Sequence, residues 1–131
     1  MARLRLREAE YLYNNQMHDG CIYLCGYVVE FALKARICKV LNLTDYPDSG
    51  ESGRIFKTHD FEILLLLAGL RNEVSLTRNK TLFDNWSTAT KWKPEQRYSP
   101  AGTCSEIEAR DRPSSIKERP HGVLAWLTKR W

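Results

Sequence analysis

The stretch from residue 20 to residue 42 constrains the fold of this chain more than any other. Its apolar side chains recur at steps of three and four residues, which is the spacing of one helix face. A helix of this length measures about 30 Å and spans a small domain. Its apolar stripe must be buried, so we predict a long helix packed against other helices. The residues of the stripe are Leu24, Tyr27, Val28, Phe31, Ala35, Cys38 and Leu41.

The rest of the chain also carries helical patterns and no convincing strand. The sequence predicts helices at residues 3–16, at about 58–69, 82–92 and 105–117, and in the tail 122–131. We expect Asp19 to cap the long helix, Thr58 to cap the following one, and Pro113 to interrupt the segment 105–117. The segment 43–57 contains a proline and two glycines and is predicted to be a loop. We therefore predict an all-α, up-and-down bundle of four to six helices in a single domain, residues 1–131.

Composition limits the classes of protein that this chain can belong to. It has 131 residues, of which 43% are hydrophobic and 27% charged, as in ordinary globular proteins, with a net charge of +4. Its longest apolar run, Ile63 to Gly69, is far shorter than the ~18 residues of a membrane span. The first ten residues have no apolar core of a secretion signal, so we expect a cytoplasmic protein without a membrane segment.

The four cysteines leave two interpretations open. Cys21 and Cys25 are one helical turn apart, and together with His18 and the distant Cys104 they could bind zinc. The alternative is that these thiols are reduced and pack in helix interiors, as small apolar residues commonly do. The spacing lacks the usual zinc-binding knuckles, so we favour the second interpretation and predict neither a metal site nor a cofactor.

Two motifs resemble a known family. The first is Glu30-x-x-Leu33-Lys34-Ala35 in the long helix, and the second is His59-Asp60 followed by Leu64 and Leu65. This pairing is similar to that of the HEPN (higher-eukaryote and prokaryote nucleotide-binding) family. The resemblance covers roughly residues 8–98, because Ala9 and Leu12 before the motifs and the stretch KWKPEQRY after them also fit.

The resemblance implies a helical bundle that forms a homodimer. Many members of the family are RNA-cutting toxins or partners of a minimal nucleotidyltransferase, which serves as the antitoxin. Other members only bind nucleotides or act as dimerisation modules. By resemblance, we expect this chain to bind RNA or a nucleotide and to be a candidate metal-independent endoribonuclease. The alternative is a catalytically degenerate domain that dimerises and docks a partner such as a nucleotidyltransferase.

The RNA-cutting members of the family use an arginine and a histidine separated by four to six residues. Arg54 and His59 have this spacing, although Ile55 stands where the family commonly has a polar residue. Histidine can donate or accept a proton near neutral pH, and arginine can hold a phosphate. We therefore predict Arg54 and His59 as the catalytic pair. The alternatives are a capping or packing role for His59 and a solvated surface position for Arg54.

Three further residues are predicted to bind nucleic acid. Lys57 lies between the two catalytic candidates, and Arg97 and Tyr98 end the family-like stretch. A cation beside an aromatic ring suits a nucleic acid base, so an exposed cluster of Trp92, Arg97 and Tyr98 would support RNA binding.

Overall fold

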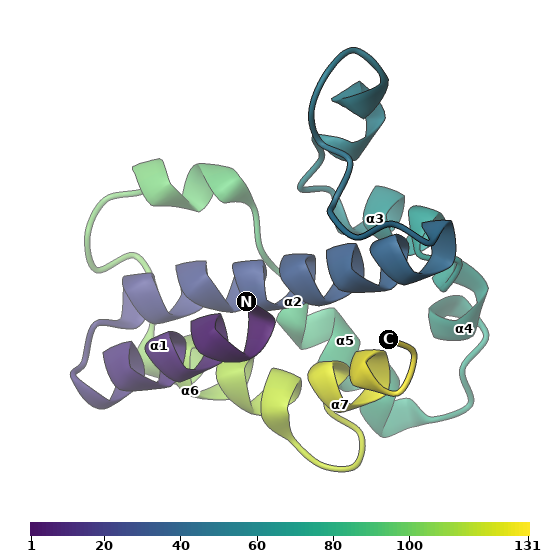
Figure 1. Cartoon of the computed structure of the whole chain (residues 1–131). Coiled ribbons are helices and arrows are strands. Elements are labelled where there is room, and N and C mark those ends of the chain that lie inside the picture. The colour runs from purple at the N-terminus through teal and green to yellow at the C-terminus, as the bar shows by residue number, and fades with distance from the viewer.

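The computed structural model of this chain is a helical bundle in which one helix, α2, occupies the centre (Figure 1). The structure describes residues 1–51 and 53–131. The α-helices are α1 (Ala2–Asn14), α2 (His18–Leu41), α3 (Phe61–Leu67), α4 (Arg71–Ser75), α5 (Lys80–Ala89), α6 (Glu106–Lys117) and α7 (Val123–Thr128). Two 3-10 helices, η1 (Ser52–Phe56) and η2 (Pro94–Tyr98), lie between them.

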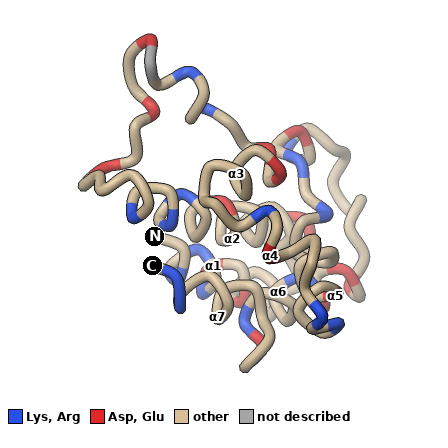
Figure 2. The backbone as a smooth tube through the Cα atoms, turned by 90° about the vertical axis from the view of Figure 1, so that its right-hand side faces the viewer, with Lys and Arg blue, Asp and Glu red and all other residues tan. Residues whose placement is uncertain are grey.

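Helix α2 is central because almost every other element packs against it. It contacts α1, α3, α5, α6, α7 and η2. Figures 1 and 2 both place α3 on one side of α2, and α1 and α7 on the opposite side. Ten of its 24 residues are buried, and they include Val28, Leu33 and Ile37. The buried face differs from the predicted stripe, because of the seven predicted residues only Val28 is buried, while Ala35 and Leu41 are exposed.

The all-α prediction is confirmed, since the described residues contain no strand. Five predicted helices appear close to their expected places as α1, α2, α3, α6 and α7. The sixth, α5, starts at Lys80 because the side chain of Asn79 accepts a hydrogen bond from the backbone of Leu82, 3.0 Å away. Helix α4 was not predicted. None of the helices in the described part of the chain has both the length and the apolar character to cross a lipid bilayer.

The start of α3 differs from the prediction by two residues. Asp60, and not Thr58, is the capping residue, because Asp60 Oδ1 accepts hydrogen bonds from the backbone of Glu62 at 2.8 Å and of Ile63 at 3.3 Å. Thr58 Oγ1 accepts instead from the backbone N–H of Asp60, at 3.0 Å. Both bonds fix the short turn that holds His59 immediately before the helix.

The predicted interruption of α6 at Pro113 is wrong, since the helix continues through this residue. A proline has no N–H and therefore leaves the carbonyl four residues earlier, that of Ala109, without its helical partner. The thiol of Cys21 donates a hydrogen bond to this carbonyl over 3.5 Å. Cys21 lies in α2, so packing between the two helices replaces the lost hydrogen bond.

Asp19 is also placed differently from the prediction, because α2 begins one residue before it. Its carboxylate accepts hydrogen bonds from the backbone of Gly102 at 2.6 Å and of Cys104 at 2.8 Å. Asp19 therefore ties the loop before α6 to the start of α2. These two backbone N–H groups stabilise the ionised form and lower the pKa of Asp19 below its ordinary value of 3.8.

We predict that Asp19→Asn lowers the free energy of unfolding by about 1 kcal/mol at pH 6, because the neutral amide is a weaker acceptor for two N–H groups. A carboxyl whose pKa is lowered by folding stabilises the protein fully above its unfolded pKa and loses this effect as the pH falls through its folded pKa. The gap between variant and wild type should thus be smaller at pH 3 than at pH 6 in urea unfolding. Asp111→Asn is the control, since Asp111 is bonded only to the neighbouring Arg110. A gap that does not change with pH would contradict this role of Asp19.

Candidate functional site: Glu30, Lys34 and His59

His59 forms a hydrogen bond with a buried carboxylate of the central helix. Its Nδ1 atom lies 2.8 Å from Oε2 of Glu30, which is 29 residues earlier in the chain. The Glu30 side chain is 2% exposed, whereas that of His59 is 48% exposed. An ionised carboxylate can only accept, so Nδ1 of His59 is the donor. The second ring nitrogen, Nε2, is then the one that can take up or release a proton.

The same carboxylate also binds a lysine. Lys34 Nζ lies 2.7 Å from Oε1 of Glu30, one helical turn away on α2, and its side chain is 15% exposed. This ammonium group also lies 4.8 Å from the centre of the Tyr46 ring. Burial, followed by the negative charge of Glu30, raises the pKa of Tyr46 to about 12. Glu30 therefore has a partner on each carboxylate oxygen, and its charge is balanced by Lys34.

Aromatic rings surround the histidine. The ring centres of Tyr27 and Trp92 lie 6.4 and 6.5 Å from that of His59, and both rings are nearly perpendicular to the imidazole. The hydroxyl of Tyr27 is 3.0 Å from that of Tyr23, and this hydrogen bond, with burial, raises the pKa of Tyr27 to about 12. The two rings thus flank His59, whose side chain remains 48% exposed.

The exposed side of His59 opens onto a cleft of about 530 Å³ between the start of α3 and the chain that joins α5 to η2. Two lysines, Lys57 and Lys93, lie on opposite walls of this cleft, and the carboxylates of Glu62 and Glu95 also line it. With Asp60, the cleft is lined by two lysines and three carboxylates. The remaining lining residues are Thr58, Phe61, Thr90, Trp92 and Pro94.

The predicted catalytic pair is not brought together within one copy of the chain. Arg54 is exposed in η1, and its side chain makes no hydrogen bond or ion pair in the part of the chain that the structure describes. The segment that carries η1 stands off from the bundle in both views (Figures 1 and 2). It is fastened at its base by Tyr46, whose hydroxyl donates to the carbonyl of Phe56 over 2.9 Å. Lys57, by contrast, lies in the same cleft as His59.

The other two nucleic-acid candidates form an exposed pair on η2. The guanidinium carbon of Arg97 lies 4.8 Å from the centre of the Tyr98 ring, and Tyr98 is 76% exposed. Trp92 does not join them, because it is only 6% exposed and packs against Phe61 with ring centres 5.6 Å apart. Arg97 and Tyr98 could therefore stack on a base, but the three-residue cluster does not form.

The alternative zinc site has no geometric support. Cys21 and Cys25 are both buried, and no group of three His, Cys, Asp or Glu side chains able to hold a metal occurs within residues 1–51 and 53–131. Burial raises the pKa of Cys104 to about 11, so this thiol stays protonated near neutral pH.

The contact between Glu30 and His59 was missed by reasoning from the sequence. The sequence pairs His59 with Arg54 and places Glu30 only within a motif, because no local spacing links residues on different elements. One signal does point to it: Glu30 lies between Val29 and Phe31 in an apolar stretch. A carboxylate buried in such a stretch needs charged or hydrogen-bonding partners.

Comparison of the chain with protein-family models, with curated proteins and with solved structures found no match. The resemblance to the HEPN family therefore rests on the two sequence motifs alone. Glu30 and Lys34 from the first motif, and His59 from the second, form one hydrogen-bonded cluster.

Proposed function

We propose that this chain is a HEPN-like cytoplasmic protein that binds RNA and cleaves it without a metal, with His59 as the general base. The hydrogen bond between His59 and the buried Glu30 carries this proposal. A carboxylate on one imidazole nitrogen fixes the tautomer and the direction of the ring, and leaves the other nitrogen for proton transfer. The lysines at positions 57 and 93 supply positive charge in the same cleft.

The reaction that fits these groups uses the RNA as its own nucleophile. Nε2 of His59 takes the proton of a ribose 2′-hydroxyl, and the resulting oxygen attacks the adjacent phosphorus. A new bond from O2′ to phosphorus forms while the bond from phosphorus to O5′ breaks, and the departing oxygen takes a proton from water. The products are a 2′,3′-cyclic phosphate and a 5′-hydroxyl. Lys57 and Lys93 would offset the negative charge that gathers on the phosphate oxygens.

A homodimer is part of this proposal because of Arg54. This arginine is exposed on a segment that projects from its own bundle, so an Arg54–His59 pair is best formed between two copies of the chain. Arg54 would then hold the phosphate across the dimer.

A cleavage assay tests the role of His59. The substrate is a fluorescent, unstructured RNA in the presence of EDTA, and the variants are His59→Ala and, as a matched control, His18→Ala. We expect the rate to fall by about 100-fold in the first variant, as for loss of a general base, and to change by less than about twofold in the second. A substrate with a single 2′-deoxyribose should resist cleavage at that position. Lack of cleavage by the wild type, or equal rates for both variants, would disprove the catalytic role.

A second candidate function, docking of a partner protein, is favoured by the apolar surface of α3. Leu64 and Leu65 are buried, but Ile63 is 42% and Leu66 is 59% exposed on the same helix, and Phe83 of α5 is 47% exposed. A nucleotidyltransferase antitoxin or a second copy of this chain would cover such side chains. Light scattering after size-exclusion chromatography, with Leu66→Glu as the variant, addresses this candidate. A wild-type monomer at micromolar concentration that captures no partner would contradict it.

A further inference from the structure

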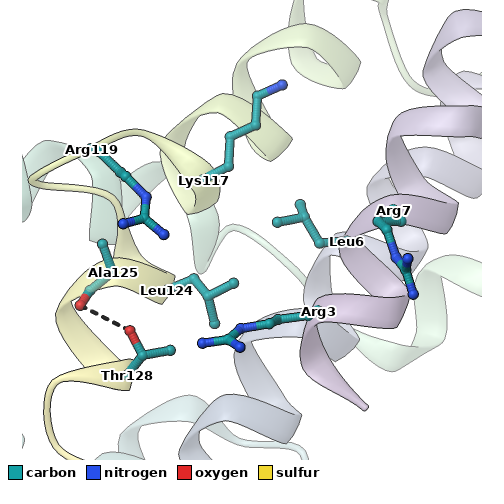
Figure 3. Close-up of a pocket in the computed structure, with 8 residues that line it drawn as sticks. All are labelled: Arg3, Leu6, Arg7, Lys117, Arg119, Leu124, Ala125 and Thr128. Carbon is teal, nitrogen blue, oxygen red and sulfur yellow. Dashed lines mark hydrogen bonds between the residues drawn. The ribbon is translucent and has the colours of Figure 1, made fainter.

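A second cleft lies on the opposite side of α2 from His59, between α1, the end of α6 and the start of α7 (Figures 1 and 3). It encloses about 580 Å³. Four of its eight lining residues are positively charged and none is negatively charged. The lining residues are Arg3, Leu6, Arg7, Lys117, Arg119, Leu124, Ala125 and Thr128.

Most of this charge is not neutralised by the protein. Lys117 is the exception, because its ammonium group lies 2.5 Å from a carboxylate oxygen of Glu10. Arg3, Arg7 and Arg119 form no ion pair among the described residues, although Arg3 lies 5.8 Å from the centre of the Trp131 ring. Repulsion between these like charges destabilises the folded protein, and a bound anion would offset this repulsion.

The side chains that point into the cleft suit a phosphate. Figure 3 shows the guanidinium groups of Arg3 and Arg119 reaching toward each other from opposite walls, with the side chain of Leu124 between them in this view. Leu6 and Leu124 are buried and form an apolar floor that anchors both walls to the core. A guanidinium group presents a planar set of donors that matches two oxygens of one phosphate. Two of them facing each other favour a ligand with adjacent phosphates.

The shape and position of the cleft favour a small ligand over an RNA strand. Helix α2 separates the cleft from His59, so a strand in the catalytic cleft could not continue into this one without passing around the bundle. Figure 3 shows the charged ends of Arg7 and Lys117 directed away from Arg3 and Arg119, so two guanidinium groups face the hollow and the positive groups form no continuous stripe. We propose that this cleft binds a compact polyphosphate group, either as inorganic triphosphate or as part of a nucleoside triphosphate. This site is independent of the proposed ribonuclease activity.

Calorimetric titration of the full chain with sodium triphosphate and with ATP, each in EDTA and about 150 mM salt, tests the proposal. The cleft variant is Arg3→Gln combined with Arg119→Gln. The control is Arg78→Gln combined with Arg110→Gln, which removes the same charge from exposed arginines outside the cleft. We expect the wild type to bind, the cleft variant to bind at least about tenfold more weakly, and the control to bind within about twofold of the wild type.

Comparison of the two ligands shows whether the cleft binds the phosphates alone or the nucleoside as well. Equal affinities would show that the phosphates alone are held, and tighter binding of ATP would show that the base is held as well; either result supports the site. Both variants change exposed side chains, so thermal unfolding should confirm that they remain folded. Lack of wild-type binding at millimolar ligand, or equal losses in both variants, would overturn the proposal. So would a cleft variant that loses affinity for single-stranded RNA only, since the cleft would then be an RNA surface.

Discussion

Replacement of Gly26 by alanine is expected to lower the free energy of unfolding by about 3 kcal/mol, or the melting temperature by roughly 10 °C. Gly26 is buried in α2, and the indole of Trp92 lies directly against it. A Cβ atom at this position would be 2.1 Å from two ring carbons of Trp92, far closer than any tolerated contact. The indole would have to move, and it packs against Tyr27 with ring centres 5.2 Å apart and against Phe61. The loss should exceed the gain of about 1 kcal/mol in helix propensity.

The same substitution at Gly20 is the control. Gly20 is in the first turns of α2, and a Cβ there would meet only the end of the flexible Leu12 side chain, at 3.1 Å. We expect Gly20→Ala to change the stability by less than about 1 kcal/mol. Urea unfolding measures both variants, and a double-mutant cycle with Trp92→Leu locates the cause. If Gly26→Ala is as costly without the indole as with it, the proposed clash is not the reason.

The sequence predicted the helices well because the information for a helix is local. The helical spacing in α2 and the short connection before it need only neighbouring residues to be recognised, although the face of α2 that is buried is not the predicted one. The errors arose where a distant group decides the outcome. Pro113 does not end α6 because the thiol of Cys21, 88 residues away, bonds the carbonyl of Ala109. Asp19 does not cap α2, since it bonds the loop at Gly102 instead.

The candidate site was predicted in part, for the same reason. The position of His59 at the entry to a helix follows from the residues around it, and α3 does begin two residues later. Its partner Glu30 could not be inferred from spacing, because the contact depends on how α2 and α3 pack. Arg54 has the right separation in sequence, yet it is not among the residues that line the cleft of His59. Spacing along the chain therefore indicates candidates, while the packing of helices selects among them.

Glu30→Gln is expected to lower the free energy of unfolding by about 2 kcal/mol, because it leaves the ammonium group of Lys34 without a counter-charge in a site that is largely closed to water. The glutamine amide has nearly the shape of the carboxylate, so the change removes charge and not packing. Its NH₂ group would also face either the donor Nδ1 of His59 or the ammonium of Lys34. Both effects weaken the attachment of α3 to α2. Urea unfolding measures the loss, and NMR of the His59 ring nitrogens should show that the preference for hydrogen on Nδ1 declines.

Asp84→Asn is the matched control, since Asp84 forms a similar pair with Lys80 that is exposed, with side chains 57% and 86% accessible. We expect this substitution to cost less than about 0.5 kcal/mol. A third variant, Lys34→Met, tests the effect of the unpaired ammonium group. In this background no ammonium group loses its counter-charge, so Glu30→Gln should lower the free energy of unfolding by at least about 1 kcal/mol less than it does in the wild type. A cost for Glu30→Gln no greater than that for Asp84→Asn would mean that the buried cluster does not hold α3 in place. Contacts other than the one with Glu30 would then have to fix the orientation of the His59 ring, on which the proposed chemistry depends.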